Sequence, residues 1–158
     1  MVNQWVLKPF EALNPFELYE AMALRQLVFV VEQNCVFIDN DGLDLKSYHL
    51  MGYDLAGKMI AYSRILPPGI DFEESSIGRV VTHPKNRGAG EGKELMVCSI
   101  QKLNQLFGNV PIRIKAQYYL IKFYRQFGFI PQGEIFLEDD IEHIEMIRTP
   151  VHQDIKEQ

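Results

Sequence analysis

Apolar residues recur along this chain with the two spacings that distinguish helices from strands. Over residues 14–33 they return every three or four positions, which predicts a long helix with Asn14 as its N-cap. One stripe of this segment mixes apolar residues with Arg25 and Glu32. The same helical spacing predicts two further helices, over residues 91–107 and 119–127.

Short runs rich in β-branched and aromatic residues predict the strands. These runs cover residues 4–9, 48–54, 58–68, 75–83 and 110–116, and two further strands are expected within 129–147. Residues 55–57 are expected to form a hairpin turn, and an acidic turn is expected at 138–140. The order of strands and helices predicts an α/β fold in which helices pack on a mixed sheet.

Length and composition indicate a single domain over residues 1–158, since 47% of the residues are hydrophobic and 23% are charged. The net charge of −5 argues against a protein whose main partner is nucleic acid, because phosphate binding needs a dense basic surface. The sequence has no apolar run near the ~18 residues of a membrane span and no secretory signal. These features predict a cytoplasmic protein without a membrane partner.

Cysteine and histidine usage gives no sign of a disulfide framework or a metal site. Cys35 and Cys98 are expected to be reduced, with Cys98 packed in the core. The histidines are scattered without the spacing of zinc ligands: His49, His83, His143 and His152. Two acidic runs, 39–44 and 137–140, would suit a cationic substrate if they lined a cleft, although most such runs are simply solvated.

The segment RVVTHPKNRGAGEGKELM, residues 79–96, joins a strand to the start of a helix through alternating glycines. Gly88, Gly90 and Gly92 allow backbone conformations that other residues avoid and let a ligand approach the main chain. The first N–H groups of a helix lack internal partners and face a positive dipole end, so this segment is a candidate anion site. An ordinary glycine-rich turn is the alternative. The spacing fits neither a phosphate loop of the Gly-Lys-Ser/Thr type nor a dinucleotide fingerprint.

Two motifs carry a family resemblance. Arg87-x-x-Gly90-x-Gly92 resembles the pyrophosphate-binding motif R/Q-x-x-G-x-G/A of the GNAT acyltransferases. AQYYLIKFYRQFGF resembles the later family motif N-x-x-A-x-x-F-Y-x-x-x-G-F, with Gln117 and Leu120 replacing its Asn and Ala. LRQLVFVVEQNC near the amino end is similar to the ElaA-like subgroup.

The resemblance implies a mixed central sheet of six to seven strands flanked by helices, with the fourth and fifth strands splayed apart. It implies acetyl-CoA as co-substrate, no metal, and direct attack by a primary amine of a small molecule, peptide N-terminus or lysine. Residues expected to contact coenzyme A are Val80, Val81, Thr82, Arg87, Gly88, Ala89, Gly90, Gly92, Lys93, Gln117 and Tyr124.

Tyr124 is expected to protonate the leaving thiolate. The general base is less determined: Glu32 is the first candidate, and His49, His143 or a water chain are the alternatives. Residues expected to contact the acceptor are Arg25, Phe29, Glu32 and His49.

Two other functions stay open. A coenzyme A-binding regulatory module would have the fold but little turnover, and Tyr124 favours the enzyme over it. The run RILPP at residues 64–68 is also similar to acyl-homoserine lactone synthases. The oligomeric state is open as well, with a homodimer as one option.

Overall fold

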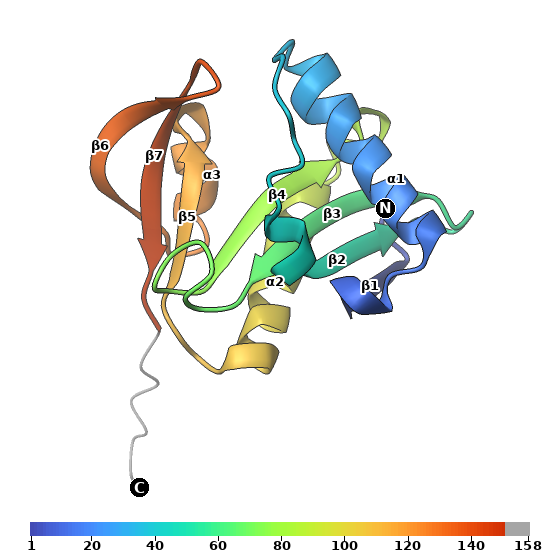
Figure 1. Ribbon diagram of the computed structural model, residues 1–158, viewed down its shortest axis with the longest axis horizontal. Coiled ribbons are helices and arrows are strands. Elements are labelled where there is room, and N and C mark those ends of the chain that lie inside the picture. Colours follow the sequence, from blue (N-terminus) through green and yellow to red (C-terminus); the bar gives the residue numbers. More distant parts are fainter. Residues whose placement is uncertain (151–158) are drawn as a thin grey trace, which may run out of the picture.

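Two antiparallel sheets form the body of the protein, which is described here over residues 1–150 of a computed structural model (Figure 1). The first sheet has the order β1-β2-β3-β4, and its strands are β1 Gln4–Pro9, β2 Tyr48–Tyr53, β3 Met59–Leu66 and β4 Ser76–Thr82. The second has the order β5-β7-β6, and its strands are β5 Ile112–Gln117, β6 Ile130–Glu138 and β7 Ile141–Arg148. The predicted strands are thus confirmed. The predicted domain extends to residue 158, so residues 151–158, His152 among them, lie outside the described part.

The two sheets meet at one end and separate toward the other (Figure 1). A parallel bridge between Ser75 and Ile112 joins them, and the Arg113 N–H donates to the Ser75 carbonyl at 2.9 Å. Beyond this junction β4 and β5 are not paired, so the expected mixed sheet is divided in two. The splay of the fourth and fifth strands is confirmed.

Local sequence signals explain where the helices begin and end. Asn14 caps α1, Pro15–Arg25, through a reciprocal pair of hydrogen bonds with Glu17 of 2.8 and 2.9 Å. The predicted helix continues past Arg25, but with π-helical turns over Gln26–Glu32. α2 spans Glu91–Phe107 as predicted, and α3 is shorter than predicted at Ile121–Arg125.

The helices cover opposite faces of the first sheet. α1 and the π-helical turns that follow it pack Ala21, Leu24 and Val28 against Met51, Met59, Tyr62 and Val81. Phe16 and Tyr19 of α1 do not take part in this packing, and they are 79% and 78% exposed. α2 contributes Leu95 to a cluster with Leu50 and Ile60, and Met96 and Leu103 to the large core that continues into the second sheet. The first sheet is therefore covered on both faces, and its core on the α2 side is shared with the second sheet.

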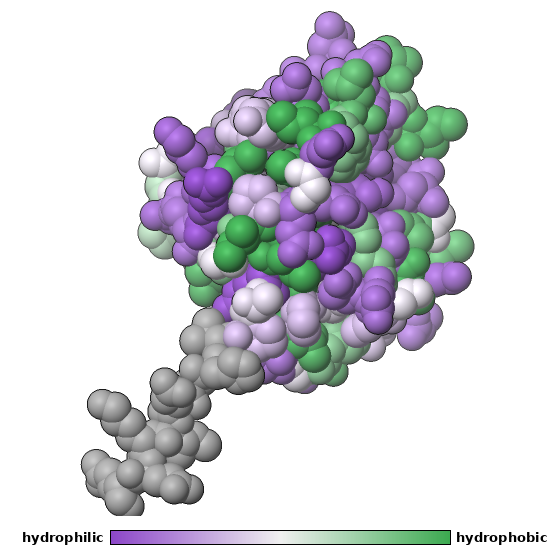
Figure 2. All heavy atoms as spheres, turned by 90° about the vertical axis from the view of Figure 1, so that its left-hand side faces the viewer, coloured by the Kyte–Doolittle hydropathy of each residue, from purple (hydrophilic) through white to green (hydrophobic). Residues whose placement is uncertain are grey.

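The strand β6 is an edge of the second sheet, and Figure 2 shows the side of the molecule on which it lies. Apolar side chains on this side are interspersed with hydrophilic ones (Figure 2). Ile130, Ile135 and Leu137 of β6 are exposed. The homodimer stays a prediction.

Candidate active site

A cleft of about 580 Å³ lies where β4 and β5 separate. This volume is in the range of small-molecule sites. The predicted residues that line the cleft are Phe29, Glu32, Val80, Val81, Thr82, Arg87, Gly92, Gln117, Tyr124 and His143. They come from the π-helical turns after α1, from β4, α2, β5, α3 and β7, and from the loop before α2, so the fold brings together most of what the motifs predicted.

The glycine loop has the backbone that its sequence predicts at two positions. Gly88 and Gly90 have φ values of +103° and +88°, and a Cβ at either would meet no atom within 4 Å. Gly92 is helical, and a Cβ there would lie 3.6 Å from the Phe123 ring, at ordinary contact distance. The backbone freedom of glycine is therefore needed at Gly88 and Gly90. Gly92 has an ordinary helical conformation that does not require glycine.

The first turn of α2 presents N–H groups that have no partner inside the helix. The N–H of Ala89 is already engaged, because it donates to Glu91 Oε2 at 3.0 Å. Lys93 is exposed on the same turn and does not line the cleft. Its contact with coenzyme A, like that of Ala89, stays a prediction.

Arg87 and Glu32 form an ion pair at the cleft. Arg87 Nη1 donates to Glu32 Oε1 at 2.7 Å, and Nη2 donates to the Thr82 carbonyl at 3.2 Å. The side chains are 42% and 37% exposed, so the pair contributes at most about 1 kcal/mol to stability. The expected pyrophosphate contact and the expected base are thus neighbours.

Tyr124 lies on α3 and is 9% exposed, with its ring edge-on to Phe123 and Phe129. Burial raises the pKa of its phenol well above the usual value, and the Tyr119 hydroxyl adds to the effect. The phenol is therefore protonated across the neutral range and can donate a proton. Gln117 reaches across the cleft, where its Nε2 donates to Gln33 Oε1 at 3.2 Å.

Two expected acceptor contacts are wrong. Arg25 and His49 are both fully buried and do not line the cleft. His49 Nε2 lies 3.0 Å from the Asp44 carbonyl, which can only accept, so Nδ1 accepts from the Tyr62 hydroxyl at 2.6 Å. Burial lowers the pKa of His49, so the ring is held neutral, and with both nitrogens engaged it cannot act as the base.

His143 does line the cleft and stays a candidate base. Its Nδ1 donates to the Ile141 carbonyl at 2.7 Å, and its Nε2 lies 4.0 Å from Glu138 Oε2. The ring stacks on Phe136 at a centroid distance of 5.8 Å.

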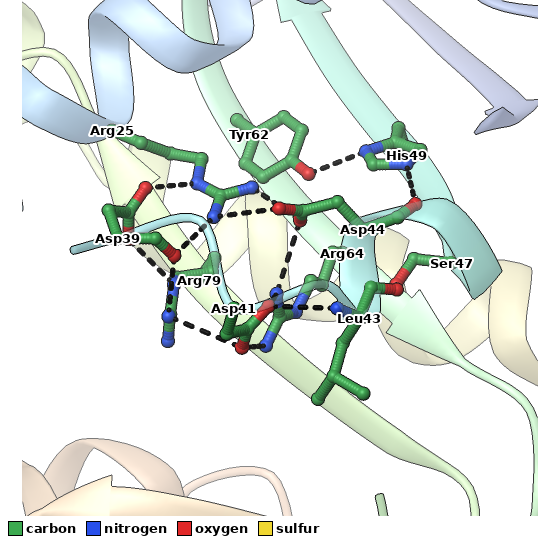
Figure 3. Close-up of polar contacts among 10 residues, drawn as sticks. All are labelled: Arg25, Asp39, Asp41, Leu43, Asp44, Ser47, His49, Tyr62, Arg64 and Arg79. Atoms are coloured by element: carbon green, nitrogen blue, oxygen red, sulfur yellow. Dashed lines mark hydrogen bonds and ion pairs between the residues drawn. The ribbon is translucent and has the colours of Figure 1, made fainter. Parts of the chain in front are cut away.

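Arg25 instead belongs to a buried network that the sequence did not reveal (Figure 3). Its Nε donates to Asp39 Oδ2 at 2.7 Å and its Nη1 to Asp44 Oδ1 at 2.6 Å. Arg64 donates to Asp41 Oδ2 at 2.6 Å and to Asp44 Oδ1 at 3.1 Å. Asp39, Asp41 and Asp44 of the first acidic run are therefore tied to buried arginines. No local pattern signals these pairs, because Arg25 lies in a helix and Arg64 in a strand, away from the loop.

We expect the network to make stability depend on acid. Burial alone would raise the pKa of Asp41, but hydrogen bonds and charge from Arg64 outweigh it and lower that pKa to about 2. The unfolded value is about 3.9. Because the folded pKa is depressed, this stabilisation is complete above the unfolded pKa and is lost as the pH falls toward 2. Urea unfolding between pH 6 and 2.5 should show a falling free energy of unfolding, with a shallower fall in Asp41→Asn; equal slopes would contradict the assignment.

Within residues 1–150, no helix has the length and apolar character to cross a membrane. No group of His, Cys, Asp and Glu side chains in that range could hold a metal ion. Cys35 and Cys98 are free thiols. Cys98 packs against the cluster that contains Leu50, Ile60 and Leu95, and Cys35 Sγ donates to the Asp139 carbonyl at 3.2 Å. The cytoplasmic location stays a prediction.

Known proteins resemble this chain in both sequence and structure. A UPF0039 protein of Synechocystis sp. is 40% identical over 151 residues, which is 95% of this chain and 98% of that protein. The crystal structure of an acyl-CoA N-acyltransferase from Pseudomonas aeruginosa has a TM-score of 0.88 at 40% identity and covers 92% of this chain and 99% of its own. The crystal structure of Escherichia coli ElaA has a TM-score of 0.85 at 37% identity, with coverage of 94% and 99%.

A more distant structure shows the fold alone. It is an aminoglycoside 6′-N-acetyltransferase complexed with coenzyme A, with a TM-score of 0.68 at 14% identity and coverage of 94% and 98%. The family model described as an acetyltransferase (GNAT) domain matches residues 39–150. This chain belongs to the GNAT acetyltransferase family, with the acyl-CoA N-acyltransferase fold and, as relatives, ElaA and the UPF0039 proteins.

Proposed function

We propose that the protein transfers an acetyl group from acetyl-CoA to a primary amine, by direct attack of the amine on the thioester. The family implies acyl-CoA-dependent N-acyl transfer. One observation carries the finer proposal: a single cleft is lined by Gly92 at the start of α2, by Val80 and Val81 of β4, and by the buried Tyr124.

The residues present fit coenzyme A. The N–H groups at the start of α2 that lack helical partners suit the pyrophosphate. The positive φ values of Gly88 and Gly90 favour glycine, so no side chain projects from these two positions. The unpaired cleft side of β4, around Val80 to Thr82, offers backbone groups to the pantetheine arm. The fold neighbour that is complexed with coenzyme A supports the same use of the fold.

The proposed reaction needs three proton and charge assignments. A base, Glu32 in the first instance, takes a proton from the incoming ammonium, and the free amine attacks the thioester carbonyl. A backbone N–H near Val81 polarises the carbonyl oxygen, where negative charge develops. The C–S bond breaks, and the Tyr124 hydroxyl gives its proton to the leaving thiolate. The attacking nitrogen loses its second proton to water, which leaves the neutral amide, and a proton from water restores the Tyr124 phenol. A buried phenol is a weak acid, but burial of the sulfur raises the thiol pKa in the same way.

The test is thiol release from acetyl-CoA in the presence of a panel of amines: small amines, peptides with a free N-terminus and peptides with an internal lysine. Release that depends on one amine class supports the proposal and identifies the class. Tight coenzyme A binding without release from any acceptor would favour a regulatory module. Turnover only with an acyl carrier and S-adenosylmethionine would favour the lactone synthase reaction.

Replacement of Gly90 by valine is expected to weaken acetyl-CoA binding about tenfold. Gly90 has a φ of +88° and open space around its Cβ direction, so valine is opposed by the backbone conformation and not by a clash. A left-handed conformation costs a side-chain-bearing residue about 1–2 kcal/mol, and relaxation would turn the loop amides away. Isothermal titration calorimetry measures the dissociation constant.

Gly57→Val is the matched control for this prediction. Gly57 has a φ of +80° and the same open surroundings, but it lies in the β2–β3 hairpin away from the cleft. The control should lose comparable stability and bind acetyl-CoA with unchanged affinity. Equal affinities of both variants for acetyl-CoA would show that residues 88–92 form an ordinary turn and not an anion site.

A further inference from the structure

Arg79 has a backbone conformation that is unusual for its residue type. It lies inside β4 with a φ of +49°. Around it the β3–β4 pairing shifts from Tyr62 opposite Val81 to Arg64 opposite Gly78, so Arg79 and Val80 together face Ser63. This is a β-bulge of the type whose left-handed position is normally a glycine. An arginine there must be held in place by something else.

The side chain of Arg79 is held by the acidic loop. Its Nη2 donates to the Asp39 carbonyl at 3.0 Å, and its Nε lies 2.8 Å from Asp39 Oδ1 as an ion pair without a hydrogen bond. Its Nη2 also lies 3.4 Å from Asp41 Oδ2. The Asp39 and Asp41 side chains face the Arg79 guanidinium from one side of the bulge (Figure 3).

Two buried arginines hold the two aspartates in place. Asp39, which is 5% exposed, accepts a hydrogen bond from the fully buried Arg25, and Asp41 accepts one from Arg64, which is 4% exposed. Asp44 links these two arginines, at 2.6 Å from Arg25 and 3.1 Å from Arg64. The loop is therefore anchored to α1 and β3, and it can act as a rigid support for the bulge in β4.

The bulge lies in the wall of the cleft, since Gly78, Arg79, Val80 and Val81 all line it. The conformation of Arg79 sets the plane of the peptide that follows it, and so the direction of the Val80 N–H and the path of the chain to Val81. In the reaction proposed above, the Val80 N–H is the group near Val81 that meets the thioester, because the ladder with β3 engages the Val81 side of the strand.

We propose that Arg79 is a positioning residue whose ion pairs with Asp39 and Asp41 hold the left-handed bulge of β4 and thereby set the direction of the Val80 N–H in the wall of the cleft. This inference rests on the proposed function for its link to catalysis. The alternative role is a direct contact between the Arg79 side chain and the acceptor. In that role the tolerance of the residue at position 79 for a positive φ would not affect turnover.

The test compares Arg79→Gly, Arg79→Asn and Arg79→Ala. All three remove the guanidinium, but they differ in how well they tolerate a positive φ: glycine best, asparagine next, alanine least. We expect kcat to follow that order, with Arg79→Gly within about threefold of the wild type and Arg79→Ala lower by about tenfold or more. Equal losses in the three variants would show that the side chain itself acts on the substrate, and would overturn the proposal.

A second readout does not need turnover. The backbone amide resonances of Val80 and Val81 should be close to wild type in Arg79→Gly and displaced in Arg79→Ala. If no amine is acetylated, these resonances still decide the bulge, so failure of the proposed function and failure of this inference are separate. Wild-type resonances in Arg79→Ala would overturn the inference; if that variant does not fold, the same comparison is made with Arg79→Asn.

A matched pair at Asp140 controls for backbone strain in general. Asp140 has a φ of +62° in the β6–β7 turn and does not line the cleft. Asp140→Gly and Asp140→Ala should differ in thermal stability but have equal kcat. A difference in kcat at Asp140 as large as at Arg79 would mean that strain alone, and not the bulge, explains the Arg79 series.

Discussion

Replacement of Tyr124 by phenylalanine is expected to lower kcat about a hundredfold while the KM for acetyl-CoA changes little. General acid catalysis contributes about 10²–10⁴-fold, and the change removes only the hydroxyl. The ring keeps its edge-on contacts with Phe123 and Phe129, so the wall of the cleft is preserved. Steady-state thiol release measures both constants, with the amine that the panel identifies.

The control for this prediction is Tyr119→Phe. Tyr119 also lines the cleft, but it is 71% exposed, so its hydroxyl is solvated and removing it should change turnover little. Its kcat should stay within about twofold of the wild type, far less than the effect of losing a general acid. Unchanged turnover in Tyr124→Phe would remove the acid role, and a raised KM with unchanged kcat would make Tyr124 a binding residue.

The pH profile offers a further check on the same residue. Burial raises the pKa of the Tyr124 phenol, so its proton is retained until the solution is more alkaline than an ordinary tyrosine requires. A fall in kcat between pH 8 and 9 would then come from another group. The base is tested separately: Glu32→Gln should lower kcat, and an unchanged kcat would exclude Glu32 as the base.

Local signals were sufficient for much of the fold. The capping residue Asn14, the apolar stripe of residues 91–107 and the turn glycines act over a few residues, so the sequence displays them directly. The turn at Asp139 and Asp140 is of this kind, because both have the positive φ that a tight hairpin needs. The split into two sheets is different, because it depends on how β4 and β5 separate beyond a single bridge.

The site was predictable where a motif carries it and not where partners are distant. The positive φ of Gly90 agrees with the glycine pattern, and Tyr124 lies in the cleft, as its resemblance to the family motif implied. The position of Arg25 was not predictable, because an arginine in an apolar helical stripe gives the same pattern whether it faces a cleft or a buried carboxylate. Its partners Asp39 and Asp44 lie in a loop whose acidic run reads equally well as a solvated surface. Sequence pattern reports which face a residue occupies, and only the fold reports what covers that face.

Replacement of Arg25 by methionine is expected to destabilise the protein by about 3–5 kcal/mol, the cost of removing one partner from a buried ion pair. The Arg25 side chain is fully buried, and its loss leaves the carboxylates of Asp39 and Asp44 short of a cation. Methionine keeps an unbranched apolar stem in the same space. Because a small domain has about 5–15 kcal/mol in total, this change approaches the limit of folding. Urea unfolding at pH 7 measures it.

The matched control, Arg113→Met, separates burial from charge. Arg113 pairs with Glu74 at 2.9 Å, but the side chains are 18% and 21% exposed, so its loss should cost at most about 1 kcal/mol. Acid gives a second test: burial alone would raise the pKa of Asp44, but the hydrogen bond and charge of Arg25 help to lower it, so this stabilisation is complete above the unfolded pKa and is lost as the carboxylate protonates. The stability gap between wild type and Arg25→Met should therefore narrow as the pH falls below the unfolded value of about 3.9. A gap that is as small as that of Arg113→Met, or that does not change with pH, would show that the aspartates do not depend on Arg25.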